Sequence, residues 1–201
     1  MRADRDAGRR HVPLGEGPLH AARPHGPGRG HTLRVGYFLR GVIGRAPFLR
    51  ERIGAHPVAK VVPLGQGLGL VPLTDALFDA LGASSSGGGG YLEGFSFLSE
   101  PVERWLTSLS QGGLVAYVEA EFFGGTGSRA AVAWRDGAVA LPPGVTTNEP
   151  DEPGERKQPR DHDWAINRAL RLMGAGAGAA VDEFDGVGLG AHRDTEDWLQ
   201  P

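Results

Sequence analysis

Two glutamates spaced two residues apart are the feature of this sequence most suggestive of chemistry. Glu119 and Glu121 lie in the run Leu114–Phe123, whose β-branched and aromatic residues predict a strand. Because successive side chains of a strand point to opposite faces, both carboxylates are expected on the same face. Paired carboxylates can bind a divalent cation or divide acid and base roles between them. They can equally form the solvated face of a hairpin, or a surface that binds a partner.

The residues around the two glutamates favour binding over catalysis. Tyr117 and Phe123 fall on the glutamate face, which is therefore acidic and flanked by aromatic rings. A glycine-rich turn of about five residues follows, and the strand-like run 129–135 completes a hairpin. No catalytic residue, metal ligand or cofactor is predicted. The candidate binding residues are Glu119, Glu121, Phe123, Gly124, Gly125, Thr126 and Gly127.

A metal-dependent hydrolase is the alternative function. It would use Glu119 and Glu121 together with His192, which lies in an acidic stretch near the C-terminus. The hypothesis requires the three side chains to converge in one pocket. Two other motifs are incomplete. The glycine-rich segment 65–69 lacks the spacing and the lysine of a nucleotide loop, and segment 94–98 lacks the second glycine of a nucleophile elbow.

Composition excludes several classes of protein. The 201 residues contain no cysteine, which removes disulfides, thiolate metal sites and cysteine nucleophiles. No apolar run reaches the 18 or more residues of a membrane helix, so a cytoplasmic protein without membrane contact is predicted. Residues 33–201 hold 15 basic and 21 acidic residues, a net charge of −6. An acidic domain of this kind suits a basic protein partner.

Residues 1–32 differ from the rest of the chain. They hold six arginines, three acidic residues, six glycines and four prolines, with no hydrophobic periodicity. Such a segment cannot bury enough apolar surface to offset its ordering entropy, so a disordered basic arm is predicted. Three interpretations are open: a solvated tail, an arm that contacts nucleic acid, or translated upstream sequence that is not part of the native protein.

Residues 33–201 are expected to form one small α+β domain, with a mainly antiparallel sheet and about four short helices. Helical spacing is clearest at 73–81, 101–109 and 164–173, and shorter helices are predicted at 47–53 and 195–199. Proline, glycine and charge predict flexible segments at 82–90 and 142–162. Strand-like runs occupy residues 33–42, 58–64, 114–123, 129–135, 138–141 and 184–189.

One segment carries a resemblance to other proteins. The run Tyr117–Val132 combines an acidic strand, Phe-Gly-Gly-x-Gly and a second strand. It resembles a segment of small uncharacterised bacterial proteins, some of which are similar to immunity proteins that neutralise a toxin from the same cell lineage. The resemblance implies a compact α+β scaffold that works by binding a protein and not by catalysis. Arg129 departs from the pattern, which has glutamine there.

Overall fold

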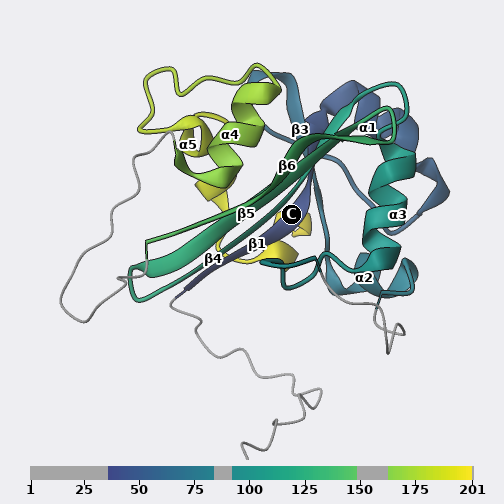
Figure 1. Ribbon diagram of the computed structural model, residues 1–201, viewed down its shortest axis with the longest axis horizontal. Helices are drawn as coiled ribbons and strands as arrows, with labels where there is room; N and C mark the ends of the chain where they lie inside the picture. The colour runs from purple at the N-terminus through teal and green to yellow at the C-terminus, as the bar shows by residue number, and fades with distance from the viewer. Residues whose placement is uncertain (1–35, 84–91, 149–162, 201) are drawn as a thin grey trace, which may run out of the picture. The chain divides into compact units, whose positions relative to one another are not determined.

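A computed structural model describes residues 36–83, 92–148 and 163–200, all within the unit that spans residues 34–201. Residues 1–32, most of segment 82–90, and residues 149–162 lie outside the described ranges, so the predictions made for them stay predictions. The described residues form a six-stranded sheet with helices on both faces (Figure 1). The predicted α+β fold is confirmed.

The sheet is antiparallel throughout, in the order β2-β3-β1-β4-β5-β6. Of its long central strands, β4 and β5 follow each other in the sequence, while β1 lies about 70 residues before them. The strands are β1 (Gly36–Arg45), β2 (Val62–Pro63), β3 (Leu68–Pro72), β4 (Leu114–Phe123), β5 (Thr126–Arg135) and β6 (Ala138–Thr147). The helices are α1 (Ala46–Arg52), α2 (Asp75–Ala80), α3 (Glu100–Leu109), α4 (Ala165–Leu172) and α5 (Glu183–Gly186), with 3-10 turns at Ile53–Ala55, Gly65–Gly67, Leu189–Ala191 and Thr195–Leu199.

Both faces of the sheet bury a hydrophobic core. On one face, which we call the α4 side, Val118 and its same-face neighbours pack with residues of α4, α5 and the C-terminal turn. On the other face, the α3 side, Val115 and Tyr117 pack with residues of α1, α2 and α3. Strands covered on both faces are apolar at nearly every position, which is why β4 is apolar except at its two glutamates.

The helices form where caps and apolar spacing agree. Thr74 precedes α2, and its hydroxyl accepts a hydrogen bond from the Leu77 backbone N–H at 3.3 Å, which satisfies one of the free donors of the first turn. In α3, Pro101 occupies the first turn, and Val102 and Leu106 are buried on one face as predicted.

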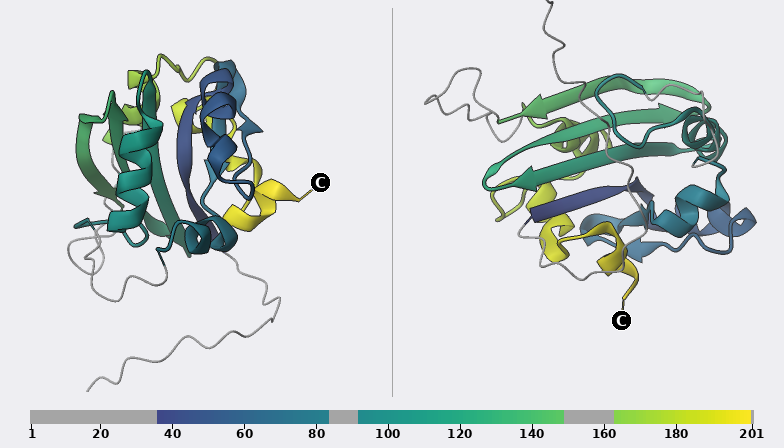
Figure 2. Two further views of the ribbon diagram at one scale, coloured as in Figure 1. Left: turned by 90° about the vertical axis from the view of Figure 1, so that its right-hand side faces the viewer. Right: turned by 90° about the horizontal axis from the view of Figure 1, so that it is seen from below.

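The C-terminal segment completes the sheet edge beside β1. Within β1, only residues 41–45 pair with β3. Beyond that point the Phe38 N–H donates to the Arg193 carbonyl at 2.8 Å, and the Arg40 N–H donates to the Thr195 hydroxyl at 3.0 Å. Figure 2 shows this segment, in yellow, alongside β1. Trp198 is buried on the α4 side, so its predicted docking on the core is confirmed.

Three predicted elements differ from the structure. Residues 142–147, predicted as part of a flexible insertion, belong to β6, where two consecutive prolines are tolerated because β6 is an edge strand. No strand was predicted between residues 64 and 73, yet Leu68–Pro72 forms β3. Residues 184–189, predicted as a strand, fall in α5 and the turn after it, because the Asp182 side chain caps that helix.

Candidate functional site

The predicted binding residues mostly lie at the end of the β4–β5 hairpin, which extends beyond the helices (Figure 1). Phe123 pairs with Thr126, so the turn consists only of Gly124 and Gly125. Their φ angles are +61° and +89°, the left-handed values that a two-residue type I′ turn requires and that glycine adopts without strain. The turn is therefore shorter than the five residues predicted, and β5 begins at Thr126.

Asn148 fixes the shape of the hairpin end. Its side-chain oxygen accepts from the Gly127 N–H at 2.8 Å, and its side-chain nitrogen donates to the Gly125 carbonyl at 3.0 Å. A methyl group on Gly127 would lie 2.0 Å from the Glu121 carbonyl oxygen, so only glycine fits there. The sequence offered no signal for the part played by Asn148, since it contacts a turn more than 20 residues away.

The hairpin end presents an aromatic ring and a carboxylate to solvent. Phe123 is 73% exposed, the largest exposure of any aromatic side chain in the described ranges. Glu121 lies two residues away on the same strand face and is also exposed. The two residues line a shallow hollow of about 280 Å³ together with Thr126, Gly127 and Ser128. This arrangement can receive an apolar group next to a cation.

Glu119 has a different environment, on the α3 side of the sheet. One carboxylate oxygen accepts from the Ser96 N–H at 2.7 Å, and the other accepts from the Phe97 N–H and the Tyr117 hydroxyl, each at 2.8 Å. Burial raises the pKa of Glu119, although these hydrogen bonds and the nearby Arg40 oppose the shift. Glu119 therefore fastens the segment around Ser96 to β4 and does not share the exposed surface of Glu121.

The space between the two glutamates is too small for a substrate. A cavity of about 30 Å³ lies beside Glu119, Glu121, Ser96 and Ser128, with room for about one or two water molecules. Paired carboxylates can act on a substrate only if it reaches both of them. Among the described residues, the cavity beside the two glutamates thus leaves no room for a substrate that would touch both.

His192 is not brought to the glutamates. Its ring contacts that of Trp198 in a tilted arrangement, with 4.7 Å between the ring centroids and 54° between the ring planes, and Trp198 belongs to the core on the α4 side. The partners of Glu119 belong to the α3 side. Among the described residues, no three histidine or acidic side chains are grouped so that they could hold a metal ion. The alternative metal site gains no support from this arrangement.

Two largely buried arginines, one on each side of the sheet, were not predicted from the sequence to be buried. Arg40 on β1 is 4% exposed, lies 4.2 Å from the centroid of the Phe97 ring and pairs with Asp75. Arg129 on β5 lies 4.1 Å from the centroid of the Phe184 ring and pairs with Asp182. An arginine inside an otherwise apolar strand pattern could have indicated a buried ion pair, because a buried charge is costly unless a partner neutralises it.

No helix among residues 36–83, 92–148 and 163–200 is long and apolar enough to cross a membrane. Comparison of the chain with protein-family models, with curated proteins and with solved structures found no match.

Proposed function

We propose that this protein acts in the cytoplasm by binding a basic protein partner through the end of the β4–β5 hairpin. The observation that carries the proposal is Phe123, which is 73% exposed on a hairpin end held by two glycines and Asn148. Exposed aromatic side chains on rigid elements are typical interface anchors, because they bury a large apolar area and lose little conformational entropy.

Charge favours a basic partner. Glu121 stands beside Phe123, and the chain from residue 33 onward has a net charge of −6. A negative surface accelerates the encounter with a basic protein and selects against acidic ones. A partner that inserts an apolar side chain beside Phe123 and places a lysine or arginine near Glu121 would match the hollow at the hairpin end.

The finer proposal is neutralisation of a toxin, as in immunity proteins. The segment Tyr117–Val132, which carries that resemblance, makes up most of the β4–β5 hairpin. An immunity protein of this kind neutralises the toxin by covering part of its surface and does not need to catalyse a reaction. The absence of room for a substrate between Glu119 and Glu121 within the described structure is consistent with such a role.

The test is isothermal titration calorimetry, in which the purified chain is titrated with the purified proteins that the neighbouring genes encode. Phe123→Ala should weaken binding of the partner by about 30-fold, a loss of about 2 kcal/mol that is usual for a buried anchor. Glu121→Gln should weaken it less, and mainly at low salt.

Val181→Ala is the matched control. Val181 is 74% exposed, belongs to the segment between α4 and α5 and does not line the hollow at the hairpin end, so its replacement should leave the affinity unchanged. If Phe123→Ala binds the partner as tightly as the wild type, the hairpin end is not the binding site. If none of the neighbouring products binds, the toxin-neutralisation proposal is wrong.

A further inference from the structure

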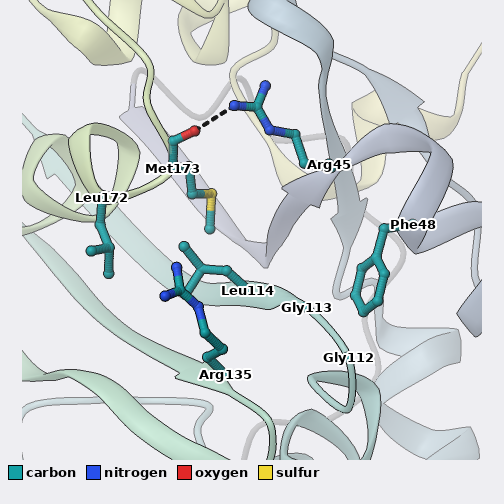
Figure 3. Close-up of a pocket in the computed structure, with 8 residues that line it drawn as sticks. All are labelled: Arg45, Phe48, Gly112, Gly113, Leu114, Arg135, Leu172 and Met173. Atoms are coloured by element: carbon teal, nitrogen blue, oxygen red, sulfur yellow. Dashed lines mark hydrogen bonds between the residues drawn. The ribbon is translucent and has the colours of Figure 1, made fainter.

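A pocket of about 380 Å³ lies at the opposite end of the sheet from the hairpin (Figure 3). It forms where the end of β1, the start of β4, the end of β5 and the end of α4 meet. Since β4 has ten residues, the two ends of the sheet are about 30 Å apart. The volume is within the range of small-molecule sites. The sequence could not reveal this pocket, because its walls come from four separate segments.

The walls of the pocket are mainly apolar. Phe48, Leu114, Leu172 and Met173 contribute apolar side chains of three kinds. Leu172 is 40% exposed although it belongs to a helix packed on the core. Because this exposed apolar side chain lies beside other apolar side chains, the pocket favours a ligand with an apolar body.

Two arginines give the pocket its charge. Arg45 donates to the Met173 carbonyl at 2.7 Å and to the Gln66 carbonyl at 3.0 Å, which leaves three of its five N–H donors for other partners. The Arg135 side chain makes no hydrogen bond or ion pair with any residue that the structure describes. Figure 3 shows its guanidinium beside Leu114, pointing toward Met173.

No acidic side chain neutralises these arginines inside the pocket. Among the described residues, those that line it carry no carboxylate. The nearby Asp136 carboxylate is turned to the Gly112 backbone, whose N–H donates to it at 3.0 Å. A third arginine, Arg52, reaches the rim, where its side chain would lie 3.1 Å from a methyl group added to Gly112. The pocket is therefore locally positive in a chain whose net charge is −3.

We propose that this pocket binds a small organic carboxylate with an apolar body, such as an aryl carboxylate. A guanidinium offers two parallel N–H donors that match a carboxylate, and its charge strengthens both hydrogen bonds. Arg135 would hold the carboxylate, while Leu114, Leu172 and Met173 would cover the apolar body. This site is separate from the hairpin end and shares no lining residue with the hollow there.

The test uses 2-naphthoate as the probe, titrated into the full chain by calorimetry. The wild type should bind 2-naphthoate at least tenfold more tightly than neutral 2-naphthylmethanol or inorganic phosphate, which each lack one half of the required chemistry. Arg135→Gln should weaken 2-naphthoate binding about tenfold or more and leave 2-naphthylmethanol unchanged. Leu172→Gln should weaken both organic probes.

Arg193→Gln is the control, because it removes the same charge from an exposed position near the other end of β1. It should bind 2-naphthoate like the wild type. Circular dichroism should show that each variant is folded; Arg135 is suited to this test because its guanidinium holds no other described residue in place. The proposal is overturned by equal binding of 2-naphthoate to Arg135→Gln and the wild type. It is equally overturned by phosphate binding as tight as 2-naphthoate binding, or by no saturable binding of 2-naphthoate at millimolar concentration.

Discussion

Asp182→Asn should destabilise this protein by about 3 kcal/mol, because it removes the negative charge that neutralises Arg129. One Asp182 oxygen accepts from Arg129 and from Asn167, each at 2.9 Å, and the other accepts from the Asp185 N–H at 2.9 Å. The Arg129 and Asp182 side chains are only 14% and 6% exposed. An asparagine would leave the guanidinium without a counter-ion and would direct an N–H₂ group at one of the three donors.

The magnitude follows from burial. Removing one partner of a buried ion pair costs about 3–5 kcal/mol. The rings of Phe184 and Trp164, whose centroids lie 4.1 and 4.9 Å from the Arg129 guanidinium, would still stabilise its charge, which places the expected loss near the lower limit. For a domain of this size, about 3 kcal/mol corresponds to a fall in Tm of about 6–12 °C.

Urea unfolding followed by tryptophan fluorescence measures the effect. Glu100→Gln is the control, since Glu100 and Arg104 are 65% and 72% exposed and lie 4.0 Å apart; it should cost less than about 1 kcal/mol.

Burial alone would raise the pKa of Asp182, but its hydrogen bonds from Asn167, Asp185 and Arg129 lower it below the ordinary value of 3.8.

The sign of the pH dependence follows from that lowered pKa. The stabilisation by Asp182 is fully present above its ordinary pKa and is lost as the pH falls through the lower pKa of the folded state. The difference in unfolding free energy between wild type and Asp182→Asn should therefore shrink below about pH 3.8. A loss under about 1 kcal/mol at pH 7 would refute the reasoning, because the pair would then behave as an exposed one.

Two further variants test the hairpin and its support. Glu119→Gln should lower the unfolding free energy by about 1–3 kcal/mol, because the amide leaves one partly buried donor, such as the Phe97 N–H, unpaired; affinity for a partner held by the hairpin end should not change. Because burial raises the pKa of Glu119 above 4.5, wild-type stability should fall as the pH rises from 4.5 through the folded-state pKa, and this part of the pH profile should be missing in the variant. Gly127→Ala should weaken both partner binding and thermal stability, since its methyl group would lie 2.0 Å from the Glu121 carbonyl oxygen. Unchanged stability of either variant contradicts the contacts described.

The sequence alone was sufficient to predict structural features that depend on residues close together in the chain. The glycines after Phe123 placed the turn of the β4–β5 hairpin, although not its length, because positive φ is needed there and glycine adopts it readily. The apolar spacing of α3 predicted its buried face for the same local reason. These patterns were enough for the α+β class.

Tertiary structure decided which surfaces remain open. Glu119 and Glu121 are equivalent by strand alternation, yet only Glu119 is covered, because the segment around Ser96 folds back over that part of β4. The counter-ion of Arg129 is 53 residues away, and the walls of the pocket that contains Arg45 and Arg135 come from four separate segments. Contacts of this range depend on how the whole chain packs, so short patterns of residue types could identify the strands and turns but not the neighbours of each side chain.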